Sequence, residues 1–232
     1  RVLFRSDDSE TKEMLSKTYP YTILITEDDD EVRGFLEREL SLHFKIRTAA
    51  NGKEALRVLE EEEISLVVSD VMMPEMNGFE LCRTIKSQLP FSHIPVILLT
   101  ALTDERQRIF GITGGADDYI QKPFHTDYVK IKIIHLLQER QKLRERLLEK
   151  LRDNKLLLSE PEKVESIDDA FLRKFAEQIE AVYADPEYNV EKLSETLGLS
   201  RGHLHRKIKE LTGTAPVEFL RTYRLNKATQ LL

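Results

Sequence analysis

Ionisable and hydroxyl side chains follow short apolar runs at four places in the first half of the chain. Five of them could take part in chemistry: Glu27, Asp28, Asp70, Thr100 and Lys122. Three carboxylates brought to one point repel one another, and a hard divalent cation with oxygen ligands, such as Mg²⁺, would offset that repulsion. A lysine and a hydroxyl at the same point suit an anion with three outer oxygens, such as a phosphoryl group. An aspartate at the centre could be the nucleophile and form an aspartyl phosphate.

The elements that must bring these residues together alternate along the chain. Apolar, β-rich runs predict buried strands, and amphipathic stretches between them predict helices. The strands are expected at Ile23–Ile25, Phe44–Thr48, Ile64–Val68, Val96–Leu99 and Asp117–Gln121, and the helices at Glu31–Leu42, Lys53–Glu62, Phe79–Gln88, Glu105–Ile112 and from Asp127 onward. This order predicts an α/β fold with a doubly wound, five-stranded parallel sheet. Ligands bind such sheets beyond the carboxyl ends of the strands, where the five residues fall. A loop-end acid is usually only a solvated cap, but five such residues at successive strand ends are poorly explained by chance.

The rest of the chain divides by composition into further regions. We expect a linker over 1–19, the α/β domain over 20–140, a helical linker over 141–163 and a small all-α domain over 164–232. The stretch 130–154 lacks Gly and Pro and carries Leu136, Leu143, Leu147 and Leu151 near one face. It fits either a charged connector helix or a dimeric coiled coil.

Composition excludes a transmembrane helix and a framework of disulfides within the chain. The 232 residues carry a net charge of −6, include one cysteine, Cys82, and contain no apolar run long enough for a transmembrane helix. A cytoplasmic location is the simplest expectation, with no membrane contact by this segment. The chain starts at Arg1 and has no signal-peptide pattern, so we expect it to be part of a longer protein. From Arg201 onward seven basic residues face only two acidic ones, which fits either a nucleic-acid partner or a solvated helical surface.

The first half of the chain resembles the receiver domain of two-component response regulators. The resemblance rests on ILITEDD at 23–29, DVMMPEMNG at 70–78, the run into Thr100-Ala101 and GADDYIQKPF at 115–124. It implies a sheet order of 2-1-3-4-5 and a histidine kinase as phosphodonor, which could lie in the same full-length chain.

The same resemblance assigns roles to residues. Asp70 would be the phosphoacceptor, and Glu27, Asp28 and the backbone carbonyl of Met72 would complete a Mg²⁺ site with it. Lys122, followed by a cis bond to Pro123, would contact the phosphoryl group together with Thr100 and Ala101, and Tyr119 would be the switch aromatic. The chain would accept a phosphoryl group and lose it slowly, without being an enzyme. A related phosphatase would need an acid at the position of Met72, which cannot donate a proton.

Within the last third of the chain, the pattern over 189–211 predicts a helix, a glycine turn and a second helix. Arg201, Gly202, His205, Arg206 and Lys209 are predicted to face outward on the second helix, which fits either a DNA reader or an ordinary helical hairpin. The segment LSETLGLSRGHLHRKIKELTGTAPVEFLRTYRLNKATQLL at 193–232 resembles the first half of an AraC-type DNA-binding domain, and the resemblance implies that the domain is truncated at Leu232. That resemblance assigns DNA contacts to Arg201, His205 and Arg206, and the basic stripe adds Lys209.

A receiver followed by such a reader resembles the carboxyl-terminal part of a hybrid two-component sensor. The predicted function is a transcription regulator whose phosphorylation at Asp70 controls homodimerisation and sequence-specific DNA binding. The alternative is a phosphorylation-gated dimerisation module that does not bind DNA.

Overall fold

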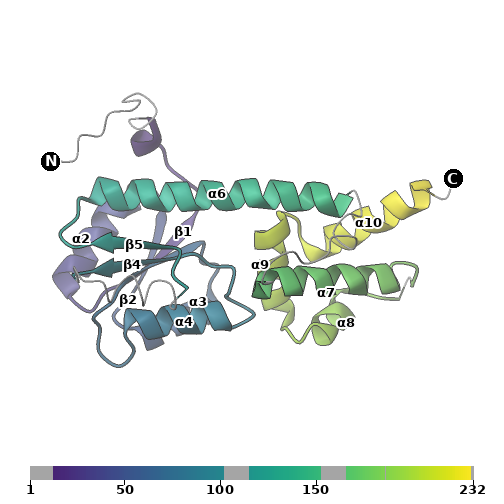
Figure 1. The fold of residues 1–232 in the computed structure, drawn as a ribbon, viewed down its shortest axis with the longest axis horizontal. Helices are drawn as coiled ribbons and strands as arrows, with labels where there is room; N and C mark the ends of the chain where they lie inside the picture. The colour runs from purple at the N-terminus through teal and green to yellow at the C-terminus, as the bar shows by residue number, and fades with distance from the viewer. Residues whose placement is uncertain (1–12, 102–114, 153–165, 186, 231–232) are drawn as a thin grey trace. The chain divides into compact units, whose positions relative to one another are not determined.

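The computed structural model describes residues 13–101, 115–152, 166–185 and 187–230 (Figure 1). The chain divides into two compact units. The sheet unit comprises residues 1–86 and 94–139, and the helical unit comprises residues 87–93 and 140–232. The helix expected over 105–112 lies outside the described residues.

The sheet unit is built on five parallel strands in the order β2-β1-β3-β4-β5. Their bounds are β1 Thr22–Thr26, β2 Lys45–Ala49, β3 Leu66–Asp70, β4 Val96–Thr100 and β5 Asp118–Gln121. β1 pairs with both β2 and β3, so Ile25 lies opposite Thr48 on one side and Val68 on the other. The doubly wound parallel sheet predicted from the sequence is therefore confirmed, including its strand order.

Helices cover both faces of this sheet. Around it the chain forms α2 Asp30–Ser41, α3 Gly52–Glu61, α4 Gly78–Ser87 and α6 Thr126–Arg152. Side chains that alternate along the strands pack against α2 and α6 on one face, as the shared cluster of Ile23, Ile25, Leu36 and Ile133 shows. In Figure 1, α3 and α4 lie on the opposite side of the sheet from α6. Burial on both faces explains why the strands are apolar at consecutive positions.

The third strand differs from its predicted range. The apolar run predicted a strand over 64–68, whereas β3 covers Leu66–Asp70 and includes two polar residues. Ser69 is fully buried, and its Oγ donates to the carbonyl oxygen of Asp70 at 2.8 Å, so its hydroxyl is satisfied inside the strand. Asp70 consequently occupies the last position of the strand, as expected for a residue that ends it.

The helical unit contains α7 Ile167–Val182, α8 Val190–Thr196, α9 Arg201–Thr212 and α10 Pro216–Gln230. A second core holds them together, with Phe171, Phe175, Leu193 and Leu204 buried. Side chains define the helix starts: Asn189 caps α8 and Ser200 caps α9. An all-α second region is thus what the structure shows.

Gly78 allows the backbone after β3 to turn back closely on Asp70. Its N–H donates to the carbonyl oxygen of Val71 at 3.0 Å, and a Cβ at Gly78 would lie 2.1 Å from the carbonyl oxygen of Asp70. That distance is far inside van der Waals contact, so any side chain here would push the loop away from the end of β3.

We expect Gly78→Ala to lower the free energy of unfolding by about 3 kcal/mol, the upper part of the range for overpacking. Gly34→Ala is the matched control, because a Cβ at this exposed position in α2 has nothing within 4 Å. It should raise stability by about 0.5–1 kcal/mol through helix propensity. Urea unfolding of both variants measures the difference, and equal stability of the two would contradict the close approach at Asp70.

Candidate functional site

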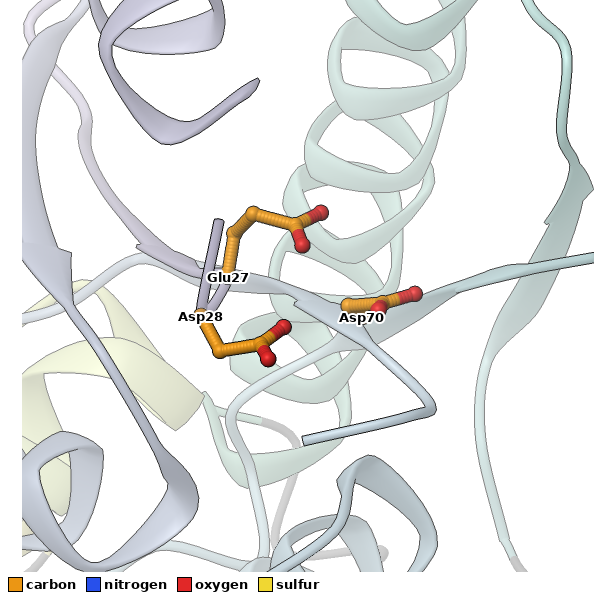
Figure 2. Close-up of side chains that lie close together, drawn as sticks. All are labelled: Glu27, Asp28 and Asp70. Carbon is orange, nitrogen blue, oxygen red and sulfur yellow. The ribbon is translucent and has the colours of Figure 1, made fainter. Parts of the chain in front are cut away.

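Three carboxylates meet at the carboxyl edge of the sheet (Figure 2). Glu27 and Asp28 follow β1, and Asp70 ends the neighbouring β3. One carboxylate oxygen from each lies within 4.8 Å of the others. The sheet register creates this convergence, since the pairing of Thr26 with Ser69 places the next residues, Glu27 and Asp70, side by side.

Lys122 lies between two of these carboxylates. Its Nζ is 2.9 Å from Oε2 of Glu27 and 2.9 Å from Oδ1 of Asp70. Lys122 directly follows β5, where its N–H donates to the carbonyl oxygen of Thr100 at 2.7 Å, and the bond to Pro123 is cis, as expected. One ammonium therefore offsets much of the repulsion between two acids from different strands.

Burial of this site shifts the pKa values of Glu27 and Lys122. Glu27 is only 2% exposed, and this burial raises the pKa of its carboxyl group above the usual value, an effect strengthened by Asp70 and opposed by Lys122. Burial by itself lowers the pKa of Lys122, but its hydrogen bonds to Glu27 and Asp70 outweigh that effect and raise it. The lysine is therefore held in its charged form, while Glu27 retains a proton more readily than an exposed glutamate would.

Arg33 supports the loop that carries two of the carboxylates. From the first turns of α2, its Nη1 donates to the carbonyl oxygen of Glu27 at 2.7 Å, and its Nη2 pairs with Asp30. Asp29 caps the same helix by accepting hydrogen bonds from the N–H groups of Glu31 and Val32. Arg33 was not predicted from the sequence as a site residue. Its spacing of three residues from Asp30 on a helix was the available signal, but the contact with the Glu27 carbonyl required the folded turn.

The remaining predicted site residues lie at the same edge or beside it. Thr100 ends β4 and is 2% exposed, whereas Ala101, the next residue, is exposed. Tyr119 in β5 is partly buried, and its Oη is buried with no hydrogen-bond partner within the described part of the chain. The side chain of Met72 is 68% exposed and points away from the core, consistent with an expected role for its carbonyl alone.

This donor set suits a divalent cation. Carboxylate oxygens from three residues are the ligands that a hard cation prefers, and their mutual distances leave room for one ion between them. Such an ion would compete with Lys122 for Glu27 and Asp70, and it would satisfy Asp28, which has no lysine or arginine within ion-pair distance among the described residues.

The helical unit presents the second group of predicted residues. Arg201 and Lys209 are exposed on α9, and His205 and Arg206 are partly exposed. Arg201 forms an exposed ion pair with Glu191 of α8, with Nη1 3.0 Å from Oε1. The turn before α9 depends on Gly198, whose φ of 68° favours glycine.

Lys207 departs from the predicted basic surface. It was counted with the charges of the basic end, but it is fully buried in α9. Its Nζ pairs with Oδ1 of Asp168 at 2.6 Å and lies 5.1 Å from the centre of the Phe171 ring. Lys207 is therefore part of the packing between α7 and α9, and the exposed basic charge of α9 is smaller than the sequence suggested.

Comparisons with known proteins agree with this geometry. The family model for the response regulator receiver domain matches residues 23–134. Histidine kinase P4 from Formosa agariphila is 36% identical over 226 residues, which cover 97% of this chain and 16% of that protein. Transcriptional regulatory protein GltR from Pseudomonas aeruginosa is 42% identical over 121 residues, which cover 52% of this chain and 50% of that protein.

Solved structures show the same likeness. A CheY-like receiver domain protein from Methanospirillum hungatei is 27% identical, with a TM-score of 0.50, and the match covers 53% of this chain and 98% of that one. Residues 23–134 are therefore a response regulator receiver domain. The chain spans half or less of the length of the first two relatives named above. Among the described helices, none is both long and apolar enough to cross a membrane.

We expect Mg²⁺ to raise the melting temperature of the protein, because an ion that binds only the folded carboxylate cluster stabilises it by mass action. Asp28→Asn should remove most of the rise. Glu31→Gln makes the same charge change at an exposed site three residues further along the chain and should leave the rise intact. Calorimetry with and without Mg²⁺ measures this, and an equal loss in both variants would point to general charge screening.

The pH dependence of this effect follows from Glu27. In the metal-free protein its raised pKa contributes stability below the unfolded pKa, and this contribution is lost as the pH rises through the raised value. Mg²⁺ displaces the same proton, so its stabilisation should shrink as the pH is lowered from about 8 to about 5.

Proposed function

We propose that this chain is a phosphorylation-controlled transcription regulator that accepts a phosphoryl group on Asp70. The observation that carries the proposal is the contact of Lys122 with both Glu27 and Asp70 at one sheet edge. A carboxylate nucleophile, a cation beside it and oxygen ligands for a metal are the parts that phosphoryl transfer to an aspartate needs. A histidine kinase is the expected donor, in line with the name of the first relative.

In the proposed reaction an oxygen of Asp70 attacks the phosphorus of a phosphohistidine. The new O–P bond forms as the N–P bond breaks, and the released imidazole takes up a proton. Mg²⁺, held by Glu27, Asp28, Asp70 and the Met72 carbonyl, would neutralise charge on the phosphoryl oxygens. Lys122 would exchange its contact with Asp70 for one with a phosphoryl oxygen.

The same group of residues gives the proposed switch. The Thr100 hydroxyl at the end of β4 would donate to a phosphoryl oxygen, and the N–H of Ala101 lies next to it in the chain. Tyr119, whose buried hydroxyl has no partner within the described residues, would occupy the space that Thr100 leaves. The chain would act as a phosphoryl acceptor that loses the group slowly, and not as an enzyme.

Acetyl phosphate with Mg²⁺ should add one phosphoryl group to the protein, and Asp70→Asn should abolish the addition because an amide is not a nucleophile. Asp28→Asn should slow the addition without preventing it. Intact-mass spectrometry after a timed reaction measures how much of each variant is phosphorylated. A phosphorylated Asp70→Asn protein would contradict the assignment.

We further propose that α9 reads DNA in the major groove. Arg201, His205, Arg206 and Lys209 lie on one helix that follows a glycine turn, and none of them is buried. The name of GltR as a transcriptional regulatory protein supports a regulatory output, although its match covers about half of this chain. Phosphorylation would favour a homodimer, which presents two readers and raises affinity through effective concentration.

The alternative is a phosphorylation-gated dimerisation module without DNA binding. The observation that favours it is Leu143 of α6, which is 55% exposed within a helix rich in leucine and charge. An exposed leucine on such a helix suits association between two copies. The two functions differ in one respect, which is whether α9 binds a duplex.

For a duplex recovered from a random pool by selection on the protein, we expect Arg206→Ala to cost about 1–3 kcal/mol of binding free energy if this side chain contacts a base. Binding should weaken steeply with salt as counterions are released. Lys174→Ala, at an exposed position of α7, controls for the loss of one charge. Fluorescence anisotropy measures both. Unchanged binding by an Arg201→Ala, Arg206→Ala double variant would contradict the assignment of DNA contacts to α9, and failure to recover any duplex would favour the dimerisation module.

A further inference from the structure

Residues 13–19, which composition assigned to a linker, are packed on the sheet unit. We call them the leading segment. Residues 13–16 form a helical turn, and Tyr19 stacks on Phe44 with ring centres 5.6 Å apart. The N–H of Tyr19 donates to the carbonyl oxygen of His43 at 2.7 Å. The segment is thus attached by both a stacked ring and a backbone hydrogen bond.

Three side-chain donors satisfy the carbonyl oxygens at the end of the helical turn. Tyr19 Oη donates to Met14, Lys130 Nζ to Leu15 and His43 Nδ1 to the carbonyl oxygen of Lys17. The carbonyls at the end of a helical turn have no partner within the turn, so side chains or water must supply one. Here two of the three donors come from elsewhere in the fold: His43 from the loop after α2 and Lys130 from α6.

Lys130 and His43 also contact each other, and this contact fixes their hydrogens. Nζ of Lys130 lies 2.6 Å from Nε2 of His43. An ammonium can only donate, so Nε2 must accept, and the ring hydrogen must then sit on Nδ1, where it points at the Lys17 carbonyl. The arrangement is self-consistent for a charged lysine and a neutral histidine.

Lys130 depends on the leading segment for one of the hydrogen-bond acceptors of its buried ammonium group. The residue is 4% exposed, and both acceptors that the described part of the chain offers to Nζ are uncharged. Burial lowers the pKa of Lys130, opposed by the more distant charge of Asp127. A buried ammonium that lost the Leu15 carbonyl would keep only the imidazole, which is costly.

We propose that His43, Phe44 and Lys130 form a dedicated seat for the leading segment, and that Lys130 makes the docking of this segment and the position of α6 depend on each other. A change in the chain that enters the sheet would then reach α6 directly, without passing through the carboxylate site. Conversely, a movement of α6 would withdraw a donor from the leading segment.

Hydrogen exchange with mass spectrometry tests this in the full chain. Lys130→Met keeps the length of the side chain and removes the buried charge, so the sheet unit should remain folded. The rate of hydrogen exchange at residues 13–21 should rise about tenfold or more, because the segment loses a hydrogen bond from a charged donor. Lys132→Met is the matched control two residues further along α6, where the lysine pairs with Asp118 at 2.7 Å. It should leave residues 13–21 unchanged.

The reverse direction uses Tyr19→Ala, which removes the stacked ring from the seat. Exchange at residues 126–133 of α6 should rise several-fold, while β3 and β4 keep their protection. Unchanged exchange at 13–21 in Lys130→Met, or at 126–133 in Tyr19→Ala, would overturn the proposal. A uniform increase over the whole sheet unit in Lys130→Met would overturn it as well, since Lys130 would then be a general core residue.

Discussion

The contact of one ammonium with two carboxylates is the constraint around which the sheet edge is organised. Glu27 follows β1, Asp70 ends the neighbouring β3, and both are nearly buried, so they cannot rely on water to reduce their repulsion. Lys122 offsets it from a third strand end. The same lysine is held by its own backbone, which bonds to β4. In the proposed reaction, the lysine that stabilises these two acids would also turn to the incoming phosphoryl oxygen.

The rest of the fold serves this edge by fixing backbone positions. The parallel register places Glu27 and Asp70 side by side, and the glycine at 78 lets the loop after β3 pass within van der Waals distance of Asp70. Arg33 holds the turn after β1 by its carbonyl. None of these contacts involves a reacting atom, but each limits how far a carboxylate can move. Preorganisation of this kind is what distinguishes a site from a cluster of surface acids.

The sequence was sufficient for the sheet and for the acids of the site. Consecutive apolar residues define strands buried on both faces, and parallel strands bring their carboxyl ends to one edge, so the sequence alone placed Glu27, Asp70 and Lys122 together. Contacts between residues that are far apart in the sequence could not be predicted from it. Lys207 was counted as surface charge because its partner Asp168 is 39 positions away. The seat of residues 13–19 was missed for the same reason, since Lys130 and Leu15 are 115 positions apart. The DNA contacts of α9 stay a prediction.

The central claim is that Lys122 holds Glu27 and Asp70 in the place of a metal until one binds, and the Mg²⁺ affinity of a Lys122→Met variant tests it most directly. Isothermal titration calorimetry at about pH 8, where acidic groups are ionised, compares the variant with the parent protein. If the ammonium competes with the cation for these two carboxylates, its removal should tighten Mg²⁺ binding several-fold, while phosphoryl transfer from acetyl phosphate slows. Weaker or unchanged Mg²⁺ binding in the variant would contradict the account, because the lysine and the metal would then not share the same carboxylates.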